Sequence, residues 1–395
     1  MSPPTTDSSV IQPRWLSTLP VRLALCSLVY DWRRFSPAVV AVGFSGLLVL
    51  LQGAIILGIF SLSSLYVTRS TADLWVGYPG VQSLDLGRPI SGTTELFLRM
   101  NPAVTRVEPV IWGSGEWRTA KHGMVNVYIV GVATRAGSMA LQSILTPEQR
   151  DQLLTPGAVL VDVADAHKLG ALVGDTAEIN GHAVRIVGMT RGLRGLGGVN
   201  VITSLANAQR VDPTLRPGAS VAYFLARLAH PEQAGSIVNT LNQLGAKRGF
   251  EAQTTMEFAN RTTHYWLAES GAGVAFVFGS VVSVLIAIVI TSQTLLAAVS
   301  GSIKEYAALR ALGFSMPALR AIVLAQSFWV GAVGVVVASI CTLLLAVIAR
   351  AAAVPLALSG GMFGLCAAIV LMVAIVSGLV ALRRVAQADP AVLLL

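Results

Sequence analysis

One short charged segment holds the residues best placed to act on another molecule. It reads GSIKEYAALRALGFSMPALR, covers residues 301–320, and lies between two long stretches without charge. Its charged residues are Lys304, Glu305, Arg310 and Arg320. Charged side chains can form ion pairs and charge-assisted hydrogen bonds with a second protein. The segment is therefore a candidate docking site rather than a catalytic one.

The same segment has the signals of a short helix. Ser302 and Glu305 have the S-x-x-E spacing of a capping box, and Gly313 is suited to end a helix. Leu309 and Leu312 fall on or near one apolar stripe, which indicates a helix of about three turns. It is either a connector, whose charges anchor the ends of the flanking helices, or a docking helix for a partner.

Signatures of catalysis and of metal binding are missing from the sequence. No G-x-x-x-x-G-K-[ST] motif is present, so the chain alone cannot hydrolyse ATP through a P-loop. The glycine-rich stretch RGLRGLGGVN (191–200) is flanked by predicted strands, so we expect a hairpin tip there and not a phosphate cradle. The histidines, which show no metal-ligand spacing, are His122, His167, His182, His230 and His264. We predict no catalytic residue, no metal site and no directly bound cofactor.

Long apolar helices must position the charged segment. Hydrophobic residues make up 54% of the chain and charged residues only 12%, which is far from the average of soluble proteins. The runs without charge lie between Arg34 and Arg69, Glu269 and Lys304, Arg320 and Arg350, and Arg350 and Arg383. Each run exceeds the roughly 20 residues that span a bilayer. We predict an integral membrane protein with four such helices.

The distribution of Lys and Arg predicts the orientation in the membrane. The apolar part of the first run is much longer than the core of a cleaved signal peptide, so we expect it to stay as an anchor. Basic residues cluster before this run, in the 301–320 segment, and at Arg383 and Arg384 after the last run. By the positive-inside rule, both termini and the charged segment are cytoplasmic. The pI of about 9.8 reflects this bias, and we predict no nucleic-acid partner.

The polar block between the first and second apolar runs predicts an outer α+β domain with two lobes. Asn180-Gly181, between TAEI and HAVRIVGM, reads as a two-residue β-hairpin turn. PEQAGSIVNTLNQLG reads as a helix between two strands, and Pro231 suits its first turn. No disulfide is available to this block, because the cysteines are Cys26, Cys341 and Cys366.

These patterns divide the chain into consecutive parts. We predict a cytoplasmic N-terminal segment, a first transmembrane helix with a stalk, and an extracytoplasmic domain, at 1–35, 36–67 and 68–268. The second transmembrane helix, the cytoplasmic helix and the third transmembrane helix follow at 269–300, 301–317 and 318–349. A short outer loop, the fourth transmembrane helix and a cytoplasmic tail complete the chain at 350–359, 360–382 and 383–395.

Three stretches resemble one family. KEYAALRALGFSMPALRAIVLAQS is similar to the K/R-E-x-x-x-L-R-A-L-G run of FtsX-like, MacB-type ABC transporter permeases, where this run forms the coupling helix that meets the ATPase. RRVAQADPAVLLL resembles the C-terminus of the same family, and LGALVGDTAEINGHAVRIVGM resembles part of its extracytoplasmic domain. The resemblance covers essentially the whole chain, with one span, an outer domain and three further spans.

The resemblance implies a function and a set of residues. The implied coupling residues are Lys304, Glu305, Tyr306, Leu309, Arg310, Leu312 and Gly313, and those of the cytoplasmic tail are Arg383, Arg384, Asp389 and Pro390. Such permeases work in the inner membrane as dimers with two ATPase subunits, which bind ATP and Mg. ATP-driven closure moves the outer domains by mechanotransmission. Tyr306 departs from the family, in which Ile, Val or Leu is common at this position. The departure affects how closely the surface of this helix matches that of the ATPase.

The resemblance also leaves alternatives open. The short N-terminal segment, Gln52 and the run ADLWVGYPGVQSLDL look most like DevC-type permeases. This subgroup implies export of a lipid-like or amphiphilic substrate or a drug, together with a periplasmic adaptor and an outer-membrane channel. The alternative is an FtsX- or Lol-like permease that regulates a cell-wall hydrolase or extracts lipoproteins.

Overall fold

The computed structural model forms two compact units. It describes residues 30–119, 123–196, 198–212, 220–302, 305–306, 308–309, 312–351 and 356–387. One unit is an α+β domain, Gly58–Ala275, and the other is built from the described helical residues on either side of it. The α+β unit therefore extends beyond the predicted range 68–268, because it includes the last turns of the first long helix and the first residues of the second.

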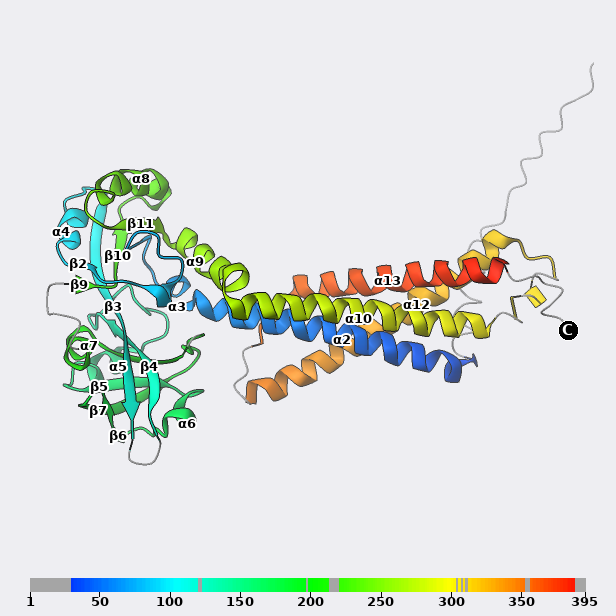
Figure 1. Ribbon diagram of the computed structural model, residues 1–395, viewed down its shortest axis with the longest axis horizontal. Coiled ribbons are helices and arrows are strands. Elements are labelled where there is room, and N and C mark those ends of the chain that lie inside the picture. Colours follow the sequence, from blue (N-terminus) through cyan, green and yellow to red (C-terminus); the bar gives the residue numbers. More distant parts are fainter. Residues whose placement is uncertain are drawn as a thin grey trace, which may run out of the picture. The chain divides into compact units, whose positions relative to one another are not determined.

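Long apolar helices make up the helical unit (Figure 1). They are α2 (Trp32–Ser63), α10 (Gly271–Gly301), α12 (Met316–Ala351) and α13 (Gly360–Gln387). Among the described residues, four helices are long and apolar enough to cross a membrane. Most of their surface is exposed in the isolated chain; in α10, only 11% of the most apolar window is buried. An apolar surface of this kind suits contact with lipid and confirms the predicted class of four candidate transmembrane helices.

Small residues let these helices approach one another. A Cβ atom on Gly334 of α12 would lie 2.5 Å from Val42 Cγ1 of α2, and one on Gly46 would lie 2.9 Å from the Ala338 side chain. Close contacts between small residues are a main source of stability for helices in lipid. The glycines of α2 and α12 therefore serve helix packing inside one chain.

The α+β domain is built on one extended sheet. Its strands are β1 (Leu74–Gly77), β3 (Val104–Arg118), β4 (Val125–Val132), β5 (Ala158–Asp162), β6 (Thr176–Ile179), β7 (His182–Thr190), β8 (Val199–Ser204), β10 (Tyr223–Leu228) and β11 (Glu251–Thr254), in the order β11-β1-β10-β3-β4-β8-β5-β7-β6. A separate pair is formed by β2 (Ile90–Ser91) and β9 (Ser220–Val221). The described residues thus confirm the predicted α+β class.

The long strand β3 joins the two lobes (Figure 1). Its first half pairs with β10, and its second half pairs with β4 and, through Trp117 and Ile179, with β6. The β3–β6 pairing closes the second lobe into a small barrel around the fully buried Trp117. Closing a sheet in this way leaves fewer strand edges open to solvent.

Short helices complete the domain. They are α3 (Leu65–Thr68), α4 (Thr94–Arg99), α5 (Pro147–Gln152), α6 (Ala166–Leu169), α7 (Leu205–Val211), α8 (Ala234–Gly245) and α9 (Thr255–His264), with 3-10 turns at Leu84–Leu86 and Pro231–Gln233 and a π-helical turn at Tyr265–Glu269. Pro231 opens the turn that precedes α8, as its position in the sequence predicted. Helix α8 places Ile237, Val238 and Leu241 in the core.

One predicted hairpin is confirmed and another is wrong. Asn180 and Gly181 have φ values of 50° and 82° and join the antiparallel strands β6 and β7, as predicted. The glycine-rich stretch 191–200 is not a hairpin tip, because β5 lies between β7 and β8 in the sheet. Its Leu193 is fully buried, and the Leu193 N–H donates to Asp162 Oδ2 at 2.8 Å.

Candidate functional site

The charged segment begins where α10 ends at Gly301, as its sequence predicted. A Cβ atom on Gly301 would lie 2.6 Å from Arg34 Nη2 of α2, so glycine leaves room for the guanidinium group. Arg34 Nη1 then donates to Glu305 Oε1 at 2.7 Å. The side chains of Arg34 and Glu305 are 25% and 50% exposed, so water partly screens this ion pair. The ion pair fastens the segment to the beginning of α2.

The predicted capping box is wrong. Ser302 is fully buried, and its Oγ has no hydrogen-bond partner among the described residues. The Glu305 carboxylate binds Arg34 instead, because a guanidinium group is a stronger hydrogen-bond partner for a carboxylate than a backbone N–H. Glu305 thus forms a contact with a distant helix, which its spacing from Ser302 did not indicate.

Tyr306 fastens the segment to a second helix. Its hydroxyl donates to Gln326 Oε1 of α12 at 2.7 Å, and its side chain is only 4% exposed. Burial raises the pKa of the Tyr306 phenol, so the phenol stays a neutral hydrogen-bond donor. The ring packs in an apolar cluster with Val299, Leu319, Ile322 and Val323. The tyrosine that departs from the resembled family therefore binds within its own chain.

Leu309 and Leu312 differ in exposure, although their spacing predicted one common apolar stripe. Leu309 is partly buried against the Tyr306 cluster, whereas Leu312 is 77% exposed. Glu305 and Ala308 are exposed as well. We call Glu305, Ala308 and Leu312 the exposed face; their spacing places them on one side of a helix. This face, and not Leu309, is available to a partner.

Gly313 ends the segment as predicted. Its φ of 94° is in the left-handed region. The Phe314 N–H donates to the Leu309 carbonyl at 3.1 Å, which is the 6→1 bond of a Schellman motif. The chain then enters α12 at Met316. The turn after Leu312 is thus fixed by backbone hydrogen bonding.

The structure describes only some of the other predicted site residues. Lys304, Arg310, Asp389 and Pro390 lie outside the described residues. Arg383 and Arg384 lie in α13, near its end at Gln387. Sequence reasoning missed Arg34 and Gln326, which bind Glu305 and Tyr306. The only signals were a basic residue just before an apolar run and an amide within one.

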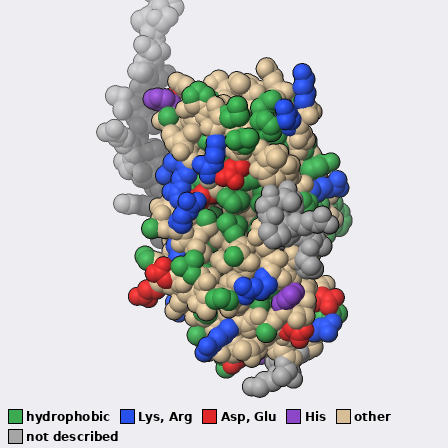
Figure 2. All heavy atoms as spheres, turned by 90° about the vertical axis from the view of Figure 1, so that its left-hand side faces the viewer, with side chains coloured by type: hydrophobic (Ala, Val, Ile, Leu, Met, Phe, Trp, Pro, Cys, Tyr) green, Lys and Arg blue, Asp and Glu red, His purple; other side chains and the backbone are tan. Residues whose placement is uncertain are grey.

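The described residues include no group of three or more His, Cys, Asp or Glu side chains that could hold a metal ion. The α+β domain buries the ionisable side chains of Glu108, Arg150, Asp162, Asp165 and Asp212 and carries others on its surface. Figure 2 shows one face, on which basic, acidic and apolar side chains are interspersed. This face has no continuous basic area of the kind that binds a nucleic-acid backbone.

Solved structures similar to this chain include two domains of transporters. The periplasmic region of MacB from Actinobacillus actinomycetemcomitans is 13% identical, with a TM-score of 0.35; the similarity covers 49% of this chain and 94% of that one. The extracellular domain of the noncanonical ABC-type transporter YknZ from Gram-positive bacteria is 14% identical, with a TM-score of 0.34. The similarity covers 46% of this chain and 100% of that one.

Comparison of the sequence with known families gives one match. No curated protein matches the sequence. Residues 277–390 match the family model described as FtsX-like permease C-terminal. This range contains the charged segment and the whole of α12 and α13. Over residues 277–390, the chain is therefore similar to the C-terminal region of FtsX-like permeases.

Proposed function

We propose that this chain is the membrane permease subunit of an ABC transporter in which a separate subunit hydrolyses ATP. The exposed face of the charged segment carries this proposal, because the segment lies within the permease-like range 277–390. The segment forms side-chain hydrogen bonds to Arg34 of α2 and to Gln326 of α12. Glu305, Ala308 and Leu312 are exposed and can contact a partner. A mere connector would need neither attachment.

The two attachments suggest how force travels. A movement of the ATPase against the exposed face displaces Glu305 and Tyr306, and with them α2 and α12. Helix α2 continues to Ser63, inside the α+β unit that begins at Gly58. A push on the segment therefore reaches the outer domain along one continuous helix. This is mechanotransmission, with transport driven by movement of the outer domain.

The helical unit favours this mechanism over an ion-driven one. Its buried polar side chains among the described residues are uncharged: Ser45, Thr291, Ser302, Gln326, Ser327, Thr342 and Ser377. Apart from the Arg34–Glu305 ion pair at the charged segment, the described helices contact one another through neutral polar groups, such as Ser292 Oγ to Ser377 Oγ at 2.8 Å and Gln52 Nε2 to Ser283 Oγ at 3.4 Å. Proton- and ion-coupled transporters rely on ionisable groups inside the membrane.

The finer assignment is to a DevC-type exporter of the inner membrane. Gln52 and the run ADLWVGYPGVQSLDL support this subgroup. Its members would act as homodimers with an ABC ATPase dimer, a periplasmic adaptor and an outer-membrane channel, and would export a lipid-like or amphiphilic substrate or a drug. A neighbouring adaptor gene supports this assignment, whereas a gene for a cell-wall hydrolase or for lipoprotein sorting contradicts it.

ATP turnover tests the proposed division of labour. The purified chain alone should show no turnover above background, since its sequence has no P-loop. Turnover should appear when the ABC ATPase encoded beside it is added, and should be higher than that of the ATPase by itself. Robust turnover by the isolated chain, or an ATPase that neither binds nor responds to it, would contradict the proposal.

Cysteine labelling tests the proposed orientation. In a variant without the native cysteines, a Ser236→Cys side chain on exposed α8 should react with a membrane-impermeant maleimide in intact spheroplasts. A Ser315→Cys side chain, exposed beside the charged segment, should react only after the membrane is permeabilised. The reverse pattern would place the charged segment outside the cell and end the ABC model.

A further inference from the structure

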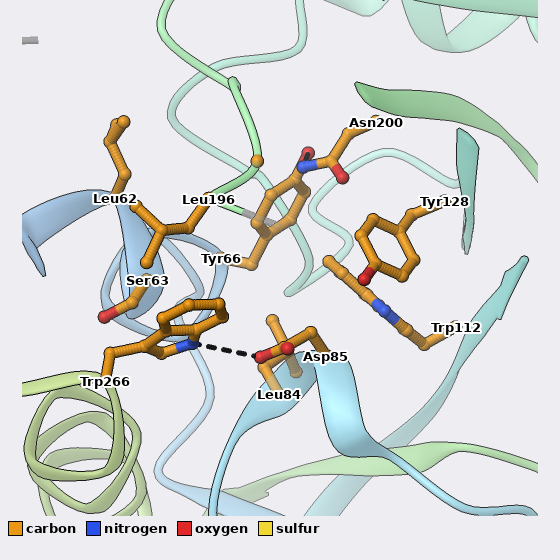
Figure 3. Close-up of a pocket in the computed structure, with 11 residues that line it drawn as sticks. Leu62, Ser63, Tyr66, Leu84, Asp85, Trp112, Tyr128, Leu196, Asn200 and Trp266 are labelled. Atoms are coloured by element: carbon orange, nitrogen blue, oxygen red, sulfur yellow. Dashed lines mark hydrogen bonds between the residues drawn. The ribbon is translucent and has the colours of Figure 1, made fainter. Parts of the chain in front are cut away.

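A small pocket in the α+β domain has the aromatic side chains of Tyr66, Trp112, Tyr128 and Trp266 in its lining (Figure 3). The side chains that line it are Leu62, Ser63, Tyr66, Leu84, Asp85, Trp112, Tyr128, Leu196, Asn200 and Trp266. Its cavity volume is about 20 Å³, which is room for one group the size of a water molecule. Any ligand would therefore place only one small group inside.

Asp85 gives the pocket a negative charge. Its Oδ1 accepts hydrogen bonds from Trp266 Nε1, at 3.2 Å, and from the Ser83 hydroxyl. No Lys, Arg or His side chain of the described chain forms an ion pair with Asp85. Burial, and then the charge of Asp85, raises the pKa of the Tyr128 phenol, which keeps this neighbour neutral. The carboxylate thus has neutral partners and no countercharge.

Asn200 adds an acceptor without a partner. The side chain is 1% exposed, and its Nδ2 donates to the Tyr66 hydroxyl at 2.8 Å and to the Leu193 carbonyl at 3.3 Å. Its Oδ1 has no hydrogen-bond partner among the described residues. A buried acceptor left unpaired is unfavourable, so a donor supplied by a ligand would be favoured.

Trp112 Nε1 points to a different ligand. It is a buried donor without a partner among the described residues, and it would suit the oxygen of a hydroxyl group. The remaining groups favour a cation: the carboxylate of Asp85, the free oxygen of Asn200 and the aromatic rings around them. Ring faces attract a cation, and they do so more strongly when water is excluded.

We propose that this pocket binds the primary ammonium group of an amphiphile. The ammonium group fits the available volume and can donate to the Asp85 carboxylate, beside aromatic rings whose faces attract positive charge. Leu62, Leu84 and Leu196 would contact the adjoining methylene groups. This site goes beyond the proposed coupling to an ATPase and does not depend on it.

The place of the pocket in the chain suits an amphiphile. Leu62 and Ser63 belong to the end of α2, and Trp266 precedes α10 closely; both helices are candidate membrane spans. Residues next to the ends of spans lie near the membrane surface, where the head groups of amphiphiles gather. Trp and Tyr are common at the membrane–water interface, but here they line a pocket that also contains a carboxylate.

Calorimetric titration of the full chain in lipid nanodiscs tests the site. The probes are octylammonium and 1-octanol, with empty nanodiscs as the blank for partitioning into lipid. Octylammonium should bind about tenfold more tightly than octanol, and Asp85→Asn should remove this difference. Asparagine can still accept hydrogen bonds from Ser83 and Trp266. Glu116→Gln, which changes an exposed carboxylate of the same domain, should leave binding unchanged.

A second variant keeps the test valid if Asp85→Asn unfolds. Leu196 is partly exposed on the loop beside the pocket, so Leu196→Lys should be accommodated and should bring a tethered ammonium group to Asp85. It should weaken octylammonium binding about tenfold or more. Equal binding of octylammonium and octanol to the wild type would overturn the proposal, as would tighter binding of octanol. Octylammonium binding that neither variant weakens would overturn it as well.

Discussion

Replacing Leu312 by aspartate is expected to weaken binding of the partner ATPase by about 100-fold or more. Leu312 is 77% exposed at the end of the charged segment. Burying a leucine side chain at an interface contributes about 1.5–3 kcal/mol. Burying a carboxylate without a partner costs more than the about 1–3 kcal/mol of an unpaired neutral polar group. Since 1.4 kcal/mol is a factor of ten in affinity, a loss of about 3 kcal/mol or more gives this 100-fold effect. ATP turnover of the reconstituted complex should fall to that of the ATPase alone.

The control for Leu312→Asp is Leu154→Asp. Leu154 is also an exposed leucine, 64% accessible, but it lies in the α+β domain. Its replacement should leave ATPase binding unchanged, because nothing connects it to the charged segment. The account fails here if Leu312→Asp inserts into the membrane normally, binds the ATPase with wild-type affinity and retains stimulated turnover.

Exchanging the charges of Arg34 and Glu305 is expected to restore a function that each inversion removes. Arg34→Glu or Glu305→Arg places like charges where the native atoms are 2.7 Å apart. An attraction of up to about 1 kcal/mol then becomes a repulsion of similar size, a change of about 2 kcal/mol. Each single variant should lose roughly tenfold or more of the ATP-driven movement of the outer domain. The double variant should recover most of it.

The readout must separate attachment from docking, since Glu305 also belongs to the exposed face. Arg34 is not on that face, so Arg34→Glu should still bind the ATPase but transmit its movement poorly. Spin labels on the α+β domain can measure the movement while turnover is followed in the same sample. Inversion of an exposed pair in that domain, Arg118→Glu with its partner Glu116, is the control. Full movement in Arg34→Glu would show that α2 is not driven through this contact.

Local signals predicted the elements well. The charge-free runs predicted the long helices, because a span must satisfy its backbone within itself and present apolar side chains to lipid. Asn180-Gly181 predicted its hairpin, since both residues adopt positive φ. Gly313 predicted the end of the charged segment. In each case, the information lies in a few neighbouring residues.

Contacts between residues far apart in the chain could not be predicted from the sequence. Arg34 and Glu305 are separated by 271 positions, and only the packing of α2 against the end of α10 shows that they pair. The same packing turns Tyr306 and Leu309 inward and leaves Leu312 outside. Periodicity placed Leu309 and Leu312 together because it cannot tell which side of a short helix another helix will cover.

The aromatic pocket shows the same limit within the α+β domain. Its lining comes from the end of α2, from η1 (Leu84–Leu86), from β3, β4 and β8, and from the residues before α10. The stretch 191–200 read as a hairpin tip because the strand order, with β5 between β7 and β8, is not visible in local patterns. Sheet topology decides which of these side chains meet.

Site-specific photo-crosslinking tests the central claim most directly. The photoreactive amino acid p-benzoylphenylalanine would be placed at Leu312 on the exposed face and, in a separate variant, at Tyr306 beneath it. Irradiation of the complex should link position 312 to the partner ATPase, and position 306, which is 4% exposed in the native chain, should give no such product. A cross-link to the ATPase from position 306, or none from position 312, would contradict the claim that this face receives the ATPase.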